Sequence, residues 1–153
     1  MSASGHPRAW DSYQTLMELV KTTALLKKAG DRFFKEHGLT QSQFNVLMVL
    51  KYDTPQGCTQ SELSRRMLVN RADMSGLVRR MEKQELVKRV DVPHDERAWT
   101  VKVSRQGKTV LEKIEPVYYA KVRSLMSVHT DRGSLAFSES LKRTQEGIRK
   151  HAF

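Results

Sequence analysis

Basic and hydroxyl side chains follow one face of the helix predicted over residues 70–84, where they have the chemistry to contact a nucleic acid. The opposite face carries apolar residues at the spacing of a buried helix stripe: Met74, Leu77, Val78 and Met81. The candidate DNA-contacting residues are Arg71, Ser75, Arg79 and Arg80. Arg71 and Ser75, near the helix start, could reach base edges, and arginine can hold guanine through O6 and N7. Arg79 and Arg80 lie further along and suit phosphate contacts. The alternative is a solvated face whose arginines pair with Asp73 and Glu82.

A second candidate contact lies at the start of the helix predicted over residues 59–67. Thr59, Gln60 and Ser61 stand where free backbone amides and the helix dipole favour a phosphate group. The same residues open the pattern Thr59-Gln60-Ser61-Glu62, a capping box in which the hydroxyl and the carboxylate satisfy backbone amides reciprocally. Thr59 is therefore expected to have a structural role in addition to any binding role.

A β-hairpin with a charged tip is predicted directly after these two helices. Residues 86–92 and 99–103 have the composition of strands, and residues 93–96 connect them. Arg97 beside this tip can enter a minor groove, where narrow A·T tracts concentrate negative potential. The alternative for Arg97 is an exposed salt bridge of small energy. Arg89 on the first strand can be a structural ion-pair partner or a DNA backbone contact, and the sequence leaves both open.

The elements that position these residues are mostly helices. Further helices are predicted from Trp10 to about His37, from Thr40 to a turn at residues 53–57, from Ser104 onward with Pro116 inside, and over residues 134–150. The first helix has apolar side chains on more than one side, so we expect it to be covered on more than one side. A capped helix, a turn, a second helix and a hairpin in this order describe a winged helix-turn-helix. The fold class is therefore mainly α with a small β-hairpin wing.

The composition suits a polyanionic partner and does not favour catalysis. The 153 residues include 27 Lys and Arg against 17 Asp and Glu, which gives a net charge of +10. The excess is +2 over residues 1–58, +3 over residues 59–102 and +5 over residues 103–153, so charge does not locate the binding surface. The five histidines are scattered without metal-ligand spacing, and the sequence lacks a glycine-rich phosphate loop. We therefore expect no enzyme activity, and the sequence implies no cofactor and no metal.

Cys58 is the only cysteine, which excludes an internal disulfide and suits a reducing compartment. It precedes a helix start, where a thiolate could be stabilised for redox sensing, although an inert turn residue is the ordinary interpretation. The first ten residues lack the apolar core of a signal peptide, and no apolar run is long enough to span a bilayer. A cytoplasmic protein without a membrane partner is expected.

Three motifs stand in order at the end of the predicted winged region: Leu86-Val87-Lys88-Arg89, Asp95-Glu96-Arg97-Ala98 and Val101-Lys102-Val103-Ser104-Arg105-Gln106-Gly107. Together they resemble the "G-L-V-x-R … D-x-R … V-x-L-T-x-x-G" signature of the MarR family of bacterial winged-helix transcription regulators. The resemblance covers roughly residues 39–115. Glu85 departs from it, because the family usually has glycine at this helix-to-strand corner. The corner is either built differently or holds Glu85 at a cost of about 1 kcal/mol.

The resemblance implies an obligate homodimer, with a monomeric helical bundle as the alternative. Residues 10–38 and 104–150 would form the helical dimerisation region, and residues 39–103 would form the winged helix-turn-helix DNA-binding domain. Asp95 would pair with Arg97 and direct it into the groove. Two recognition helices related by a two-fold axis would read a pseudo-palindromic site with half-sites about one helical turn apart. Repression is the family's common mode.

The resemblance also implies that a small, often aromatic or phenolic acid, or oxidation of a cysteine, releases the DNA. Four aromatic residues fall near the pocket expected between the dimer helices and the winged domain: Trp10, Tyr13, His37 and Phe44. The alternative for each of them is an ordinary core position. A competing function for the whole chain is a helical protein-interaction module that keeps the winged fold without binding DNA, and its affinity for DNA would not depend steeply on salt.

Overall fold

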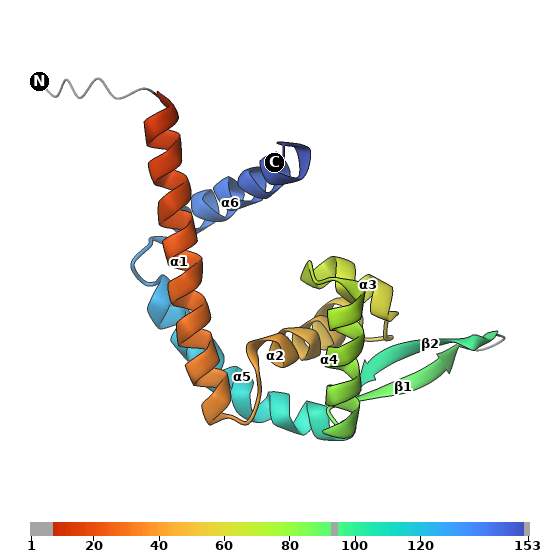
Figure 1. Ribbon diagram of the computed structural model, residues 1–153. Coiled ribbons are helices and arrows are strands. Elements are labelled where there is room, and N and C mark those ends of the chain that lie inside the picture. Colours follow the sequence, from red (N-terminus) through yellow and green to blue (C-terminus); the bar gives the residue numbers. More distant parts are fainter. Residues whose placement is uncertain (1–7, 93–94, 152–153) are drawn as a thin grey trace, which may run out of the picture. The chain divides into compact units, whose positions relative to one another are not determined.

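The protein is mainly helical with one antiparallel hairpin, as predicted (Figure 1). The computed structural model describes the backbone of residues 8–92 and 95–151, and the side chains of residues 10–92 and 99–151. In chain order the elements are α1 (Arg8–Glu36), α2 (Gln41–Met48), the π-helix η1 (Val49–Asp53), α3 (Gln60–Met67), α4 (Arg71–Lys83), β1 (Val87–Val92), β2 (Asp95–Val103), α5 (Arg105–Met126) and α6 (Asp131–His151). Among the described residues, no helix is both long enough and apolar enough to cross a membrane.

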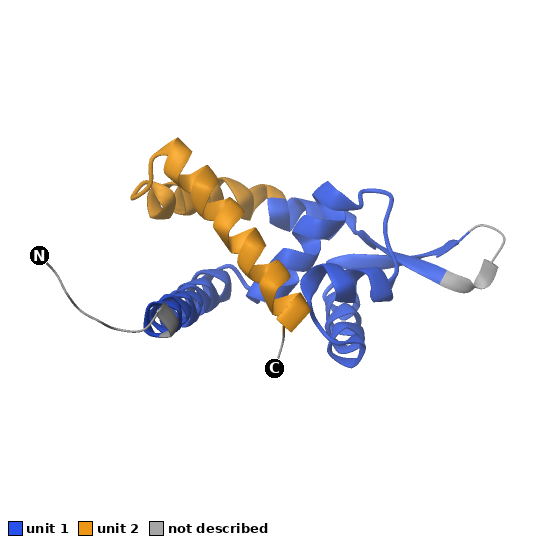
Figure 2. Ribbon diagram, turned by 90° about the horizontal axis from the view of Figure 1, so that it is seen from above, with its two compact units in different colours: residues 1–111 blue, residues 112–153 orange. Residues whose placement is uncertain are grey.

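Two compact units, Met1–Leu111 and Glu112–Phe153, divide the chain inside α5 (Figure 2). The first unit contains the helices from α1 to α4, the hairpin and the beginning of α5. The second unit contains the remainder of α5 and all of α6. Every residue predicted to contact DNA or an effector therefore belongs to the first unit.

The core of the first unit forms where the end of α1 meets α2. The Phe34 ring stacks on the Phe44 ring with centroids 4.6 Å apart, and Phe33 packs edge-on against Phe34 at 5.0 Å. Further side chains without measurable exposure come from α2 to α5: Val46, Leu47, Leu63, Met74, Val78, Met81, Val101 and Leu111. Full burial of one such side chain stabilises the fold by about 1.5–3 kcal/mol relative to exposure.

Polar residues cap the starts of α2 and α4, where the sequence predicted helices to begin. In the capping box of α2, Gln43 N donates to Thr40 Oγ1 at 3.2 Å and Thr40 N donates to Gln43 Oε1 at 2.9 Å. At the start of α4, Asp73 N donates to Asn70 Oδ1 at 2.8 Å. Each cap satisfies backbone amides that the first helical turn leaves without a partner.

The predicted capping box of α3 forms only in part. Glu62 N donates to Thr59 Oγ1 at 3.2 Å, so the hydroxyl acts as expected. The Glu62 carboxylate, however, accepts from Arg66 Nε and Nη2 at 3.1 and 2.8 Å. Arg66 lies one turn further along the same face and offers charged donors, which makes it a stronger partner than a backbone amide.

Two residues with left-handed backbone flank α4. Leu68 before the helix has φ 53°, and Glu85 after it has φ 57°. The corner where the family usually has glycine therefore keeps its left-handed turn and holds Glu85 in a conformation that costs L-residues about 1–2 kcal/mol. Ser104 fastens this corner to the start of α5, because its hydroxyl donates to the Glu85 carbonyl and its N donates to Leu86 O at 3.1 Å.

One face of the hairpin packs against the core of the first unit. Residues 87, 89 and 91 of β1 lie opposite residues 103, 101 and 99 of β2, and these six positions share a face because strand residues alternate. Val87, Val101 and Val103 on this face are buried. Val101 also exchanges backbone hydrogen bonds with Cys58, at 2.8 and 3.2 Å. β2 begins at Asp95 rather than at the predicted residue 99.

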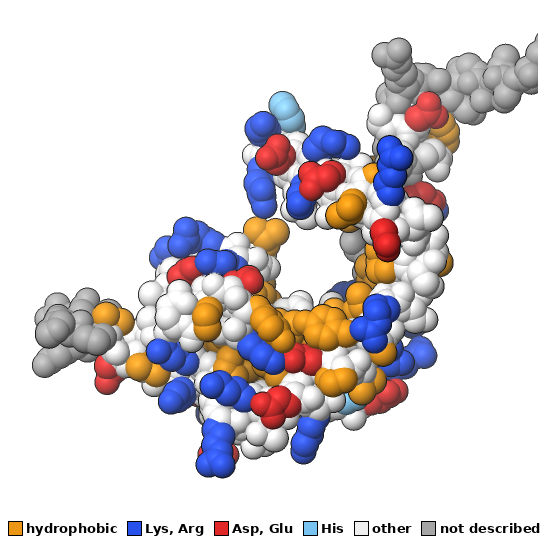
Figure 3. Space-filling view, turned by 180° about the vertical axis from the view of Figure 1, so that it is seen from behind, with side chains coloured by type: hydrophobic (Ala, Val, Ile, Leu, Met, Phe, Trp, Pro, Cys, Tyr) orange, Lys and Arg blue, Asp and Glu red, His pale blue; other side chains and the backbone are white. Residues whose placement is uncertain are grey.

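Apolar side chains remain exposed on the long helices. In the first unit they lie along α1: Trp10, Tyr13, Leu16, Val20, Leu25 and Leu26. In the second unit they lie on α5, on α6 and between them: Val117, Tyr119, Leu125, Val128, Leu135, Phe137 and Ile148. No residue of α6 is buried, although the structure describes the helix throughout. Figure 3 shows hydrophobic side chains at the surface among the Lys and Arg side chains. Exposed apolar surface of this extent is typical of interaction sites.

Candidate nucleic-acid interface

The exposed face of α4 carries the four residues that its sequence pattern singled out. Met74, Leu77, Val78 and Met81 fasten the opposite face to the core. The side chains that remain exposed include all four candidates: Arg71, Ser75, Arg79 and Arg80. The backbone around Asn70 presents the N-terminal end of this helix to solvent, since Asn70 itself is exposed.

The two acidic residues of α4 have partners other than the candidate arginines. Asp73 accepts a hydrogen bond from the Asn70 side-chain amide at 2.5 Å. Glu82 Oε1 lies 2.7 Å from Arg89 Nε of β1. The alternative in which Asp73 and Glu82 neutralise this face is therefore not the arrangement that the structure shows.

The start of α3 offers a smaller contact region. Ser61 is exposed, and Thr59 is exposed while its hydroxyl oxygen caps the helix. Gln60 is partly buried, and its Nε2 has no hydrogen-bond partner among the described residues. Thr59 and Ser61 thus lie at the surface beside the first amides of α3, which is the geometry that favours a phosphate.

The candidate residues at the hairpin tip are only partly described. The backbone of Asp95 and Arg97 belongs to β2, whereas their side chains lie outside the described residues. The predicted Asp95–Arg97 pair and the entry of Arg97 into a groove therefore stay predictions. For Arg89 the structure shows the first of the two options, an ion pair between its guanidinium and the Glu82 carboxylate.

Sequence reasoning missed a pair of lysines on the other face of the hairpin. Lys88 of β1 stands directly opposite Lys102 of β2. Like charges directly opposite on one face of a sheet destabilise it. A phosphate backbone would offset this repulsion, so the pair is a further candidate for contact with a polyanion. Finding it requires the strand register, which single-residue patterns do not provide.

Cys58 is buried behind the hairpin, with only 3% of its surface exposed. Burial raises the pKa of the Cys58 thiol, and the weaker opposing effect is the hydrogen bond from Thr54 Oγ1 to Sγ at 3.5 Å. A thiol kept protonated and shielded in this way reacts slowly with oxidants. The geometry thus favours the inert interpretation over the redox sensor.

The four aromatic residues proposed for an effector pocket lie in different surroundings. Trp10 and Tyr13 form an exposed pair on α1 with ring centroids 5.6 Å apart. Phe44 is 1% exposed and belongs to the core, where it stacks on Phe34. His37 Nδ1 lies 2.8 Å from the Phe33 carbonyl. The role of these four residues in an effector pocket between the dimer helices and the winged domain stays a prediction.

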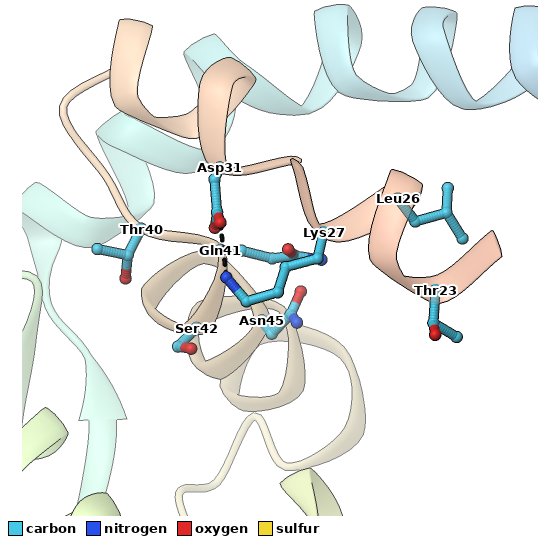
Figure 4. A pocket seen from close by; sticks show the side chains of 8 residues that line it. All are labelled: Thr23, Leu26, Lys27, Asp31, Thr40, Gln41, Ser42 and Asn45. Atoms are coloured by element: carbon cyan, nitrogen blue, oxygen red, sulfur yellow. Dashed lines mark hydrogen bonds and ion pairs between the residues drawn. The ribbon is translucent and has the colours of Figure 1, made fainter. Parts of the chain in front are cut away.

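A cavity of about 430 Å³ does lie between α1 and the start of α2 (Figure 4). All but one of its lining residues have polar or charged side chains: Thr23, Leu26, Lys27, Asp31, Thr40, Gln41, Ser42 and Asn45. Lys27 Nζ and Asp31 Oδ2 form an ion pair at 2.6 Å within it. Polar residues on a long helix give no sequence signal for a pocket, because a solvated helix face has the same pattern.

Comparison with known proteins adds a family match and relatives that align with most of the chain. The family model described as "MarR family" matches residues 37–98. The transcriptional activatory protein BadR of Rhodopseudomonas palustris is 30% identical, over 84% of this chain and 79% of its own. The HTH-type transcriptional repressor YetL of Bacillus subtilis is 23% identical, over 85% of this chain and 78% of its own.

Solved structures share the fold over nearly the whole chain. Sco3205 of Streptomyces coelicolor, a MarR family transcriptional regulator solved in complex with DNA, superposes with a TM-score of 0.84 at 22% identity, covering 94% of this chain and 92% of its own. The MepR–DNA complex of S. aureus gives a TM-score of 0.76 at 18% identity, with 89% and 96% of the two chains covered. These likenesses establish the winged-helix architecture.

Proposed function

The chain belongs to the MarR family of DNA-binding transcriptional regulators, and we propose that it is a homodimeric repressor. In this proposal the dimer binds a pseudo-palindromic operator. The family consists of regulators of transcription and not of enzymes. The arrangement of α4 carries the proposal, because one side is fastened to the core while Arg71, Ser75 and Arg79 are exposed. A helix held in this way can lie in a major groove with its polar side toward the bases.

The proposed contacts divide by their chemistry. Near the start of α4, Arg71 and Ser75 read base edges, and the arginines further along bind phosphate. The start of α3 binds the phosphate backbone, and Arg97, directed by Asp95, enters the minor groove. The complete set of proposed DNA-contacting residues is Thr59, Gln60, Ser61, Arg71, Ser75, Arg79, Arg80 and Arg97.

A second copy of the chain is the proposed cover for the exposed apolar faces of the long helices. Residues 10–38 and 104–150 form the dimerisation region in this proposal, and residues 39–103 form the DNA-binding domain. Leu16 and Val20, one turn apart on α1, are 43% and 50% exposed. Burial of side chains of this size is the main driving force of association between helices in water.

The operator follows from the two-fold symmetry of such a dimer. Two copies of α4 would enter successive major grooves, so the half-sites would be about 10 base pairs apart. The relatives include one protein named as a repressor and one named as an activatory protein, which leaves the direction of control to experiment. Repression in the cytoplasm is the proposed mode.

The cavity between α1 and α2 is the proposed effector site. Its volume of about 430 Å³ suits a small organic molecule, and an organic acid that displaces the Asp31 carboxylate would pair with Lys27. Gln43 follows the lining residues Gln41 and Ser42, and its Nε2 donates to Gln84 Oε1 at the C-terminal cap of α4. A ligand that shifts the start of α2 would therefore also shift the end of α4.

Selection of bound duplexes from a random pool tests the DNA-binding proposal. The purified chain should enrich a pseudo-palindrome, and the logarithm of its affinity should fall steeply with the logarithm of salt concentration. Arg97→Ala should weaken binding to the selected site at least tenfold, about 1.4 kcal/mol. Arg32→Ala on α1 is the matched control, because it removes the same charge from an exposed position outside the proposed DNA contacts. Since Arg32 lies in the proposed dimerisation region, its sedimentation is compared with that of the wild type. A flat salt dependence would instead favour the protein-interaction module.

Sedimentation tests the dimer. The wild-type chain should sediment as a dimer at micromolar concentration, and Leu16→Lys should shift it toward the monomer by placing a charge in the apolar interface. Thr15→Lys, at the neighbouring exposed position of α1, is the control for added charge. A wild-type chain that remains monomeric at every concentration would remove the dimer, and with it the requirement for a pseudo-palindrome.

Calorimetry with salicylate and benzoate as probes tests the effector site. Either acid should bind the wild-type chain and lower its affinity for the operator. Lys27→Met should lower the affinity of the chain for the acid. Lys28→Met is the control, since Lys28 is exposed on the same helix but does not line the cavity. Equal effects of the two substitutions would place the acid elsewhere.

A further inference from the structure

Three side chains from three elements meet on the hairpin face that carries the buried Val87, Val101 and Val103. We call this face the inner face. Glu82 comes from the last turn of α4, Arg89 from β1 and Trp99 from β2. Arg89 Nε lies 2.7 Å from Glu82 Oε1, and Arg89 Cζ lies 4.0 Å from the centroid of the Trp99 ring. The guanidinium thus contacts a carboxylate of the proposed recognition helix and an aromatic ring of the opposite strand. We call this group the Arg89 bracket.

The strand register explains why these side chains meet. Arg89 lies opposite Val101, and Trp99 lies two residues before Val101 on the same strand, so Arg89 and Trp99 are diagonal neighbours. Val87 and Val103 occupy the same face closer to the core and are buried. The bracket therefore begins where the apolar root of the hairpin ends.

The ion pair is partly shielded from water. The exposed fraction of the Glu82 side chain is 24% and that of Arg89 is 45%. Exposed ion pairs contribute little by themselves, but this ion pair and the cation–π contact together restrict the position of the guanidinium. A two-stranded hairpin has little stability of its own, so a contact that ties both strands to a helix restricts its direction.

We infer that the Arg89 bracket sets the direction of the hairpin relative to α4, and that Arg89 is a positioning residue rather than a DNA ligand. The inference rests on the proposed function, in which α4 and the hairpin contact one duplex together. A groove contact at the hairpin tip needs the tip at a fixed distance from α4. Holding that geometry before DNA arrives lowers the ordering cost of binding.

The charges around Arg89 argue against a direct phosphate contact. A phosphate at Arg89 would approach Glu82, whose carboxylate is within 2.7 Å of the same guanidinium, and would meet its repulsion. Lys88, next along β1, points to the opposite face and stands opposite Lys102 without a bracket of this kind. Among the hairpin side chains that the structure describes, the cations that suit phosphate are therefore Lys88 and Lys102, on the face opposite to the inner face that carries Arg89.

Substitutions of the two charged partners separate positioning from phosphate binding. Glu82→Gln removes a negative charge, so simple electrostatics would tighten DNA binding, whereas loss of positioning would weaken it. We expect Glu82→Gln and Arg89→Gln each to weaken operator affinity about three- to tenfold, and the double variant to be no weaker than the weaker single variant. The salt dependence of binding should keep its wild-type slope in all three, because no phosphate contact is lost.

The matched control is Lys88→Gln, which removes one positive charge from the adjacent residue on the other face. Its effect should add to that of Glu82→Gln instead of overlapping with it. Urea midpoints of all variants are compared, so that a loss of affinity through unfolding is recognised. Tighter binding by Glu82→Gln, or a salt slope smaller by about one in Arg89→Gln, would show that Arg89 is a phosphate ligand and overturn the inference.

A measurement without DNA tests the bracket itself. The chain has two tryptophans, so Trp10→Phe leaves Trp99 as the only one. Quenching of Trp99 by acrylamide should increase in Arg89→Gln and also in Glu82→Gln, since the carboxylate holds the guanidinium over the ring. Unchanged quenching in Glu82→Gln would overturn the inference even if operator binding is weakened as expected. A wild-type chain that binds no duplex would refute the proposed function, while the quenching result would still decide whether the bracket exists.

Discussion

Gly107, in the first turn of α5, is the position where the smallest substitution should do the most damage. A β-carbon there would lie 2.1 Å from the Leu86 carbonyl oxygen and 2.9 Å from Val103 Cγ1. The carbonyl cannot move freely, because it accepts from Ser104 N at 3.1 Å. Gly107 N in turn donates to Ser104 Oγ at 2.9 Å. Gly107→Ala must therefore push the start of α5 away from the corner between α4 and β1.

The expected loss of stability follows from these contacts. Overpacking costs about 1–3 kcal/mol, and disruption of two hydrogen bonds of Ser104 costs about 1 kcal/mol each. Alanine in a helix recovers about 1 kcal/mol relative to glycine. The net destabilisation of Gly107→Ala is therefore about 2–4 kcal/mol.

The matched control is Gly147→Ala in α6, where a β-carbon would meet no other atom within 4 Å. This variant should gain up to about 1 kcal/mol from helix propensity. Urea unfolding followed by circular dichroism measures both variants at one protomer concentration, because association contributes to apparent stability. A Gly107→Ala chain as stable as the wild type would refute the tight approach of α5 to Leu86.

Three further substitutions probe single features. Glu85→Gly should stabilise the chain by about 0.5 kcal/mol in urea unfolding, since it relieves the left-handed strain but increases the entropy of the unfolded chain; a loss would reveal compensating contacts of Glu85. Asn70→Ala should lower the free energy of unfolding by about 1 kcal/mol in the same assay, because Asp73 N loses its acceptor. A stability equal to that of the wild type would show that the Asn70 cap does not stabilise α4. Burial raises the pKa of Cys58, so as pH rises above its ordinary value of 9.0 the unfolded chain releases this proton first and stability falls. Cys58→Ala should remove that decline, and iodoacetamide should modify Cys58 rapidly only in the unfolded chain.

Features set by neighbours in the sequence could be predicted, and those set by distant partners could not. The caps at Thr40 and Asn70 follow from residues three positions away, and both are present. At Thr59 the same reasoning failed for one half of the motif, because Arg66 on the next turn competes for the Glu62 carboxylate. The left-handed corner at Glu85 was recognisable only because glycine was expected there.

The site was predictable where one helix face determined it. Periodicity correctly placed the candidates of α4 on the exposed side. It could not show that Phe44 stacks on Phe34, because a buried stripe does not reveal what covers it. The contacts of Arg89 could not be predicted either, because they depend on the strand register, which places Trp99 beside it, and on the end of α4, which brings Glu82 within reach.

The opposed ammonium groups of Lys88 and Lys102 give dissolved salt two contrary effects on the hairpin. In the unbound protein, added ions screen the repulsion between the two side chains and thereby stabilise the pairing of the two strands. On a duplex, the same ions compete with both side chains for phosphate. An ionic strength that weakens the complex with DNA should thus make the free hairpin more resistant to a protease. A high-salt buffer that protects the isolated protein from cleavage would therefore be unsuitable for measuring its binding to DNA.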